Sequence, residues 1–233
     1  EAEREALVRQ NCIYFMQAWL DRSWLWHGHP ETVRRRLRLG GEVAALEGDT
    51  PTVIFAPHFV GLDAGWTALT SQLERRFCTI YAEQLNQSVD RWILAGRQRF
   101  GQAHIVPRRQ GLKPLVAALR AGEPLYLLPD MDYGAHDSVF VPFFGVPAAT
   151  IPMVSRIARM IGARVVMGVT EMTDDGYVLH FEPPWADFPG ASIEEDTARM
   201  NRELERWVLR MPDQYLWTHK RFKTRPPGAP AIY

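Results

Sequence analysis

The stretch Thr52–Leu69, T-V-I-F-A-P-H-F-V-G-L-D-A-G-W-T-A-L, decides the fold class of this chain. Its first five residues are apolar or β-branched and end at Pro57, which is typical of a short buried strand. Large apolar residues then recur at helical spacing and predict a helix from Leu62 to about Arg75. A strand that leads directly into a helix is the repeating unit of an α/β fold, and ligands in such folds bind where strands end.

Two polar residues stand at this junction, where chemistry is expected. His58 follows the predicted strand, and Asp63 lies five residues later in the first turn of the predicted helix. A carboxylate that accepts a hydrogen bond from one ring nitrogen would leave the other nitrogen free to remove a proton from a hydroxyl group. The spacing alone favours a plainer interpretation, in which Asp63 is an N-cap or first-turn acid and His58 an ordinary loop residue.

The rest of the sequence continues the alternation of strands and helices. Further helices are expected at 1–20, 31–39, 88–100 (with Ser88 as its N-cap), 112–119, 151–161 and 193–210, and further strands at 78–82, 104–106, 125–128, 139–144, 163–170 and 177–181. We therefore predict an α/β fold with a central mixed, mostly parallel sheet flanked by helices. It forms a single domain over 1–233, with an amphipathic helical region at 1–50, the α/β catalytic core at 51–225 and an irregular tail at 226–233.

Composition excludes several classes of protein. The chain has 27 basic and 27 acidic residues, so its global charge selects no partner. Its two cysteines, Cys12 and Cys78, have no metal-like spacing and favour a reducing compartment. The sequence shows no apolar run long enough to span a membrane and no signal-peptide pattern. A tryptophan-rich segment at 19–26 lies near the basic cluster 34–38, which fits either a membrane-interface surface or a core-facing helix.

Common catalytic motifs are missing as well. The sequence lacks a phosphate-binding glycine loop and a G-x-S-x-G nucleophile motif. Asp130, Asp132 and His136 are metal-compatible residue types, but their spacing is typical of a turn, so we expect no metal. The basic clusters lack the interleaved aromatic residues of an RNA-binding sheet, so we expect no nucleic acid.

The remaining candidates are His58 with a carboxylate, an arginine and a second acidic turn. Arg97 shares a helix face with Val89 and Ile93, which directs it inward or into a cleft, unless it is an ordinary arginine at a helix end. Asp130 follows the predicted strand 125–128. This set suits transfer of an acyl group from a thioester to a hydroxyl group without a covalent enzyme intermediate, with Arg97 stabilising an oxyanion or holding a phosphate.

Five motifs carry a resemblance to known acyltransferase families. H-F-V-G-L-D at 58–63 resembles the H-x4-D/E motif of glycerolipid-type acyltransferases. D-R-W-I-L-A-G-R at 90–97, L-P-D-M-D-Y-G at 128–134, V-F-V-P-F-F-G at 139–145 and Q-Y-L-W-T-H-K-R-F-K-T-R-P at 214–226 resemble, in the same order, the bacterial lipid A late acyltransferases. The match runs from about Thr52 almost to the C-terminus, and the segments at 128–134 and 214–226 are the specific ones.

The resemblance implies an acyltransferase that uses acyl carrier protein as co-substrate, without a cofactor, and acylates a lipid A precursor at the cytoplasmic face of the inner membrane. By position in the motifs it implies catalytic roles for His58, Asp63, Arg97 and Asp130. For Asp130 we expect that it positions Arg97 or another cation. Substrate-binding or structural roles are expected at four further positions, namely Asp132, Arg156, His219 and Arg221.

Two departures from the family pattern qualify the expectation. The sequence shows no N-terminal apolar anchor helix, so either the chain starts after such an anchor or it docks through the tryptophan-rich segment and the basic cluster. The motif acid is Asp63, where lipid A members commonly have glutamate, which leaves the acceptor open. Other glycolipid or glycerolipid acceptors, hydrolysis by the same residues, and a non-catalytic acyl-lipid binding module are the alternatives.

Overall fold

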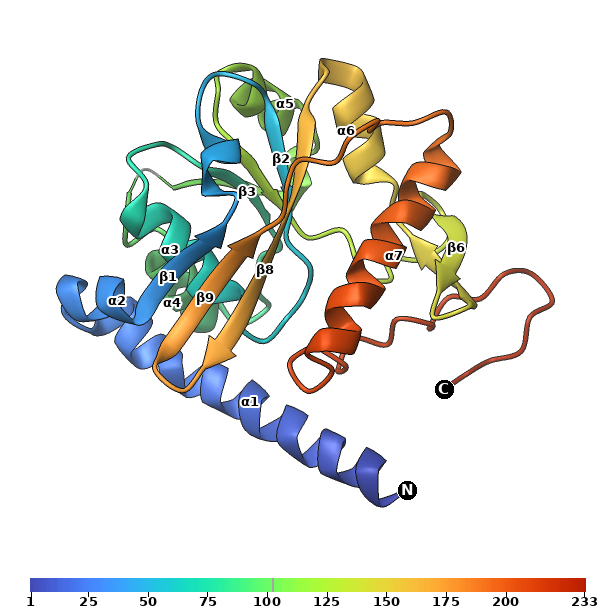
Figure 1. Cartoon of the computed structure of the whole chain (residues 1–233), viewed down its shortest axis with the longest axis horizontal. Helices are drawn as coiled ribbons and strands as arrows, with labels where there is room; N and C mark the ends of the chain where they lie inside the picture. The colour runs from blue at the N-terminus through green and yellow to red at the C-terminus, as the bar shows by residue number, and fades with distance from the viewer. Residues whose placement is uncertain (102) are drawn as a thin grey trace.

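The computed structural model describes residues 1–101 and 103–233. The helices are α1 (Ala2–His27), α2 (Pro30–Arg36), α3 (Leu62–Gln72), α4 (Gln87–Arg97), α5 (Lys113–Arg120), α6 (Met153–Ile161) and α7 (Ile193–Arg210). The strands are β1 (Leu37–Gly41), β2 (Thr52–Phe55), β3 (Cys78–Tyr81), β4 (His104–Pro107), β5 (Leu125–Leu127), β6 (Val139–Phe143), β7 (Val146–Thr150), β8 (Arg164–Thr173) and β9 (Gly176–Phe181). Figure 1 shows their arrangement.

A seven-stranded sheet with the order β1-β9-β8-β2-β5-β3-β4 forms the centre of the fold. The five strands from β8 to β4 are parallel, and β9 turns back antiparallel to β8 through the hairpin at 174–175 and then pairs in parallel with β1. The sheet is therefore mixed and mostly parallel, as the sequence predicts. A separate antiparallel pair, β6 with β7, packs beside α7.

Helices cover both faces of the sheet, which explains why the central strands are apolar throughout. Val53 and Phe55 point toward the side of α5, α6 and α7, whereas Ile54 packs with Trp66 of α3 on the opposite side. The approach of α3 to β8 is close, because a Cβ at Gly65 would lie 2.1 Å from the hydroxyl oxygen of Thr170. Glycine is required there for the helix to reach the sheet.

Some of the predicted helices and strands match the structure, and others differ in type or bounds. The strand at β2 and the bounds of α7 match the prediction. The helix predicted at 31–39 ends at Arg36, and its remaining residues form the edge strand β1. The segment expected to turn directly into α6 is instead the strand β7. Asn86, rather than Ser88, caps α4, because its side chain accepts hydrogen bonds from the backbone N–H groups of the second and third residues after it.

The first helix lies along the carboxyl-terminal side of the sheet (Figure 1). It is longer than predicted, and its apolar residues do not all face the core, since Met16 and Leu20 are exposed while Leu25 and Trp26 are buried. Within the described part of the chain, no helix is both long and apolar enough to cross a bilayer.

Candidate active site

The sheet register brings His58 against Asp130. Adjacent strands β2 and β5 pair Val53 with Leu125, an offset of 72 residues, and the same offset of 72 separates His58 from Asp130 just beyond the strand ends. The ring Nδ1 of His58 lies 2.7 Å from Oδ1 of Asp130, and the backbone N–H of His58 donates to Oδ2 at 2.9 Å. Both residues are buried. Asp130 therefore fixes the ring through two contacts and leaves Nε2 as the nitrogen that can accept a proton.

The carboxylate that orients His58 is thus not the predicted one. The expectation that Asp63 holds the ring is wrong in this structure. We expected Asp130 to position Arg97 or another cation; it contacts His58 instead of Arg97, and the charge of Arg221 also helps to lower its pKa. Asp63 accepts a hydrogen bond from Nε of Arg97 at 2.7 Å and one from Nε of Arg22 at 2.8 Å. The physical reason is placement, because Asp63 lies in the first turn of α3, facing α1 and α4, whereas the end of β5 lies directly beside the end of β2.

Asp63 with its two arginines forms a buried charged triad. Burial alone would raise the pKa of Asp63, but the guanidinium groups of Arg97 and Arg22 outweigh it and hold that pKa below its ordinary value. Burial likewise opposes the ionisation of Asp130, and its contact with His58 lowers its pKa. The triad carries one net positive charge at the wall of the site.

A cavity of about 340 Å³ opens at His58, Asp63 and Arg97. The remainder of its wall is largely apolar and comes from α1, α3, the ends of β3 and β5, α6 and the C-terminal segment. Representative apolar lining residues are Phe15, Leu62, Ile80, Leu128, Met153 and Leu216. The site therefore joins a buried histidine, held by a carboxylate, to an apolar slot.

The C-terminal segment grips the loop that carries His58. The backbone N–H of Leu216 donates to the carbonyl of His58 at 2.9 Å, and the N–H of Val60 donates to the carbonyl of Gln214 at 2.9 Å. The ring of His219 packs edge-on against the ring of His58, with 4.7 Å between their centroids. Burial, with a further contribution from His58, lowers the pKa of His219 from 6.5 to about 4. His219 is therefore neutral beside the His58 ring at neutral pH.

This neutral histidine makes stability depend on pH in a defined window. Between about pH 4 and 6.5 the unfolded chain binds a proton at His219 that the folded chain does not, so stability falls as pH is lowered through that window. We expect His219→Gln to flatten the dependence of Tm on pH there, measured by thermal unfolding. His136→Gln, at a side chain that is 95% exposed, is the matched control and should keep the wild-type slope. Equal slopes in all three proteins would contradict the assignment.

Asp132, Arg156 and Arg221 do not line the described cavity, although the charge of Arg221 helps to lower the pKa of Asp130. Asp132 accepts hydrogen bonds from the N–H groups of Gly134 at 2.9 Å and Thr224 at 2.6 Å, so it fastens its own turn to the C-terminal segment. Arg156 is exposed on α6 and does not line the cavity. Arg221 is only 2% exposed and donates to the carbonyl of Ala149 at 2.7 Å. The structure gives Asp132 and Arg221 structural roles, and the expected substrate contact of Arg221 is not supported.

Sequence reasoning missed the contribution of α1. Arg22 completes the charged triad, and its guanidinium stacks 3.8 Å from the ring centroid of Trp19, which also lines the cavity. The three-residue spacing of Trp19 and Arg22 places them on one helix face and was the available signal. Nothing in the sequence indicates that this face meets Asp63, because that contact depends on how α1 crosses the sheet.

Comparison with known proteins identifies the family. The family model described as "Bacterial lipid A biosynthesis acyltransferase" matches residues 1–224. The chain belongs to this family. The prediction of the family from its motifs is therefore confirmed.

Curated members of the lipid A acyltransferase family are similar over most of this chain. The lipid A biosynthesis lauroyltransferase of Escherichia coli K12 is 37% identical over 76% of this chain and 57% of its own length. The palmitoleoyltransferase of that strain is 30% identical over 99% of this chain and 76% of its own length, and the myristoyltransferase is 32% identical over 98% and 72%. The chain thus spans between about half and three quarters of these relatives.

A solved structure also aligns with the chain. The crystal structure of the 1-acyl-sn-glycerophosphate acyltransferase PlsC from Thermotoga maritima covers 90% of this chain and 91% of that one, at 15% sequence identity and a TM-score of 0.47.

Proposed function

We propose that this protein transfers a fatty acyl group from a thioester to a hydroxyl group of a lipid A precursor. The observation that carries the proposal is the His58–Asp130 pair at the mouth of an apolar cavity, in a chain of the lipid A acyltransferase family. The donor is acyl carrier protein thioester, and no cofactor takes part. His58, Asp130, Asp63 and Arg97 are the proposed catalytic group.

The chemistry follows from the orientation of the His58 ring. With Nδ1–H donated to Asp130, Nε2 removes the proton from the acceptor hydroxyl as its oxygen attacks the thioester carbonyl carbon. The tetrahedral intermediate collapses by breaking the carbon–sulfur bond. The departing thiolate takes the proton from Nε2, which restores the neutral ring. Asp130 stabilises the imidazolium that exists between these two proton transfers.

The charged triad stabilises negative charge that is present or develops during the reaction. Arg97 and Arg22 both line the cavity, and Asp63 fixes their orientation, so their net positive charge is prepared before substrate binds. That charge suits the developing oxyanion or a phosphate of either substrate. Removing Asp63 would therefore disturb the reaction through the arginines and not through His58.

The apolar wall serves the acyl chain. Each methylene group that leaves water for the cavity contributes about 0.8 kcal/mol. Remote binding of the chain in this way positions the thioester carbon at the catalytic ring.

The direct test is product analysis. The purified chain is incubated with acyl carrier protein thioesters of several lengths and lipid A precursor in detergent, and lipids are identified by mass spectrometry. Acylated precursor supports the proposal. Free fatty acid alone would indicate a hydrolase. Acylation of an added glycerolipid but not of the lipid A precursor would identify a glycerolipid as the acceptor. A thioester that is not consumed would indicate a non-catalytic binding module.

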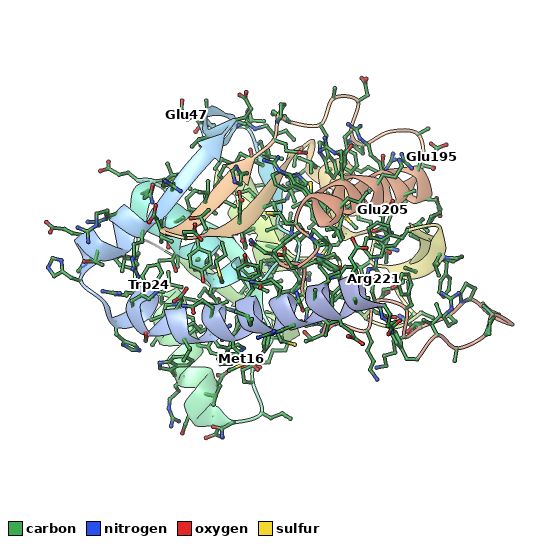
Figure 2. The ribbon with its side chains drawn as sticks, turned by 60° about the horizontal axis from the view of Figure 1, so that its bottom comes forward. Met16, Trp24, Glu47, Glu195, Glu205 and Arg221 are labelled. Atoms are coloured by element: carbon green, nitrogen blue, oxygen red, sulfur yellow. The ribbon has the colours of Figure 1, made fainter. Side chains whose placement is uncertain are left out.

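We further propose that α1 seats the protein on the membrane that holds the acceptor. Figure 2 shows α1 across the front of the molecule with Met16 labelled on it. Its side chains Ile13, Met16 and Leu20 are 48%, 55% and 64% exposed, and Trp19 joins this surface to the cavity. The basic cluster of α2 at Arg34–Arg36 is also exposed and can meet anionic headgroups.

A charge on this surface is expected to weaken membrane binding. Burial of a leucine side chain contributes about 1.5–3 kcal/mol, so Leu20→Glu should reduce binding to anionic lipid vesicles roughly tenfold or more. The measurement is vesicle co-sedimentation. Leu209→Glu, at a leucine of α7 that is 71% exposed, is the matched control. Equal losses in the two variants would assign the effect to charge alone and contradict docking through α1.

A further inference from the structure

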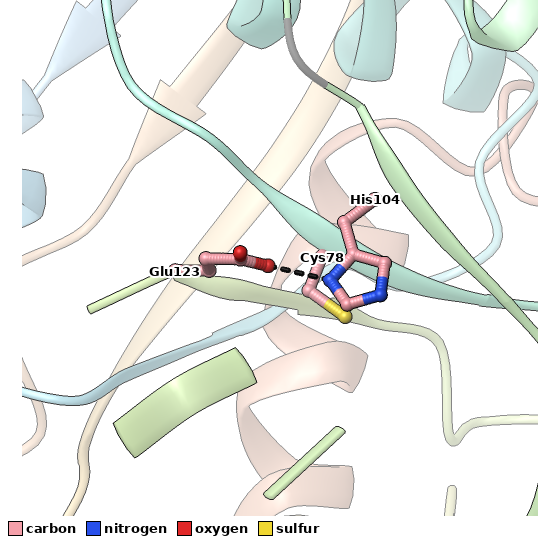
Figure 3. A group of neighbouring side chains, drawn as sticks. All are labelled: Cys78, His104 and Glu123. Atoms are coloured by element: carbon pink, nitrogen blue, oxygen red, sulfur yellow. Dashed lines mark hydrogen bonds and ion pairs between the residues drawn. The ribbon is translucent and has the colours of Figure 1, made fainter. Parts of the chain in front are cut away.

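Three side chains with metal-binding atoms meet at the edge of the sheet opposite the active site. Cys78 is the first residue of β3, His104 is the first residue of β4, and Glu123 precedes β5 by two residues. Because β5, β3 and β4 are parallel neighbours, their amino-terminal ends share one edge. The register places Cys78 directly between His104 and the start of β5 (Figure 3).

The three donor atoms are already close together. One ligand atom from each residue lies within 4.8 Å of the other two. Nδ1 of His104 is 2.6 Å from Oε2 of Glu123, while the other carboxylate oxygen lies 3.3 Å from Nε of Arg76. Cys78 is buried, whereas the side chain of His104 is 30% exposed, so the cluster has a side open to water.

We propose that Cys78, His104 and Glu123 bind a divalent transition-metal ion, with Zn²⁺ as the best match. Thiolate, imidazole and carboxylate are the ligand types that zinc uses, and three protein ligands leave a fourth position for water on the open side. The sulfur ligand disfavours Mg²⁺ and Ca²⁺, which prefer oxygen. This site is independent of the proposed acyl transfer, because it lies at the other end of the strands.

The charges of the cluster balance when a metal ion binds. Without a metal ion, burial and the charge of Glu123 raise the pKa of the Cys78 thiol to about 12, so the thiol keeps its proton. A divalent ion reverses that preference, and the thiol proton passes to solvent. The resulting thiolate and the carboxylate neutralise the two charges of the ion. Arg76 remains on the second oxygen of Glu123 and orients that carboxylate.

Metal binding is expected to stabilise the edge of the sheet. In the described sheet β4 is an edge strand whose one pairing is with β3. A metal ion that joins His104 to Cys78 and Glu123 fastens this edge to the next two strands. It stabilises the folded chain by an amount that rises with the logarithm of the metal concentration above Kd, since the site requires three segments that come together only in the folded state.

The test uses the second cysteine as an internal control. The chain has two cysteines, and Cys12 is exposed, so the Cys12→Ser protein keeps Cys78 as its single thiol. Titration of this protein with Co²⁺ should produce a thiolate-to-cobalt charge-transfer band that saturates at one ion per chain and disappears when Zn²⁺ is added. Zn²⁺ should also raise its Tm. Absence of the band would overturn the proposal.

Further variants exclude adventitious binding. Cys78→Ser should abolish the band. Glu123→Gln keeps the side-chain shape but removes the carboxylate ligand, so it should weaken Co²⁺ binding by at least roughly 10- to 100-fold, the usual effect of losing a residue that only orients a ligand. Arg76 orients Glu123 without binding the ion, and its side chain is 49% exposed. Arg76→Gln should therefore weaken Co²⁺ binding by that roughly 10- to 100-fold. If Cys78→Ser does not fold, Glu123→Gln decides. Affinity unchanged in Glu123→Gln would contradict the assigned ligand set.

Discussion

Replacing His58 with alanine is expected to reduce the acyl transfer rate by about 10²- to 10⁴-fold, the usual contribution of a positioned general base. The acceptor hydroxyl is then left without a group that takes its proton, while the cavity keeps its apolar wall. The measurement is steady-state formation of acylated lipid from acyl carrier protein thioester. Because binding is preserved, we expect the loss in kcat with little change in KM.

Two controls make this expectation specific. Thermal unfolding should show that His58→Ala still folds cooperatively. His180→Ala removes another partly exposed histidine of the sheet, one that does not line the cavity, and should leave the transfer rate unchanged. A His58→Ala protein with near wild-type turnover would exclude the base assignment.

Replacing Asp130 with asparagine is expected to have an effect of the same order, about 10²- to 10⁴-fold in kcat. Asparagine preserves the volume but cannot stabilise the imidazolium, and it no longer selects the Nδ1–H tautomer of His58. The contrast with Asp63→Asn is decisive, because Asp63 contacts Arg22 and Arg97 and not His58. We expect nitrogen NMR of the His58 ring to show a changed tautomer in Asp130→Asn only.

The Asp63→Asn variant should differ in stability as well. Removing one partner of a buried ion pair costs about 3–5 kcal/mol, since the arginines are left without their counter-charge. The stability that Asp63 contributes to the unchanged protein depends on pH with a definite sign. The folded pKa of Asp63 is below its unfolded value of about 3.9, so the carboxylate stabilises the fold above that pH and this contribution is lost as pH falls further. A changed His58 tautomer in Asp63→Asn would instead restore the motif acid as the orienting group.

The sequence predicts the elements that local chemistry determines. The strand β2 and the helix α7 follow from hydrophobic spacing, and Ser192 caps α7 through a hydrogen bond to the N–H of Glu195. The edge strand β1 could not be predicted, because Leu37–Gly41 gains its conformation from pairing with β9, about 140 residues away. Tertiary pairing overrode a helical composition there.

The same distinction holds in the site. The motifs at two strand ends single out His58 and Asp130 as candidate site residues. Which carboxylate holds the ring depends on strand order, since only the adjacency of β2 and β5 brings Asp130 within 2.7 Å of the ring. Sequence distance suggested Asp63, five residues away, and the sheet selected a residue 72 positions away. The contact of Arg22 with Asp63 also depends on tertiary packing, so the sequence does not predict it.

The hold of the C-terminal segment on the His58 loop has a consequence for biosynthesis. The carbonyl of His58 and the N–H of Val60 are satisfied by Leu216 and Gln214, and Asn11 of α1 donates to the carbonyl of Tyr215 at 2.8 Å. The loop that carries His58 therefore reaches this arrangement only after residues 214–216 have left the ribosome. A nascent polypeptide that has not yet presented residues 214–216 lacks these contacts to the His58 loop and to α1.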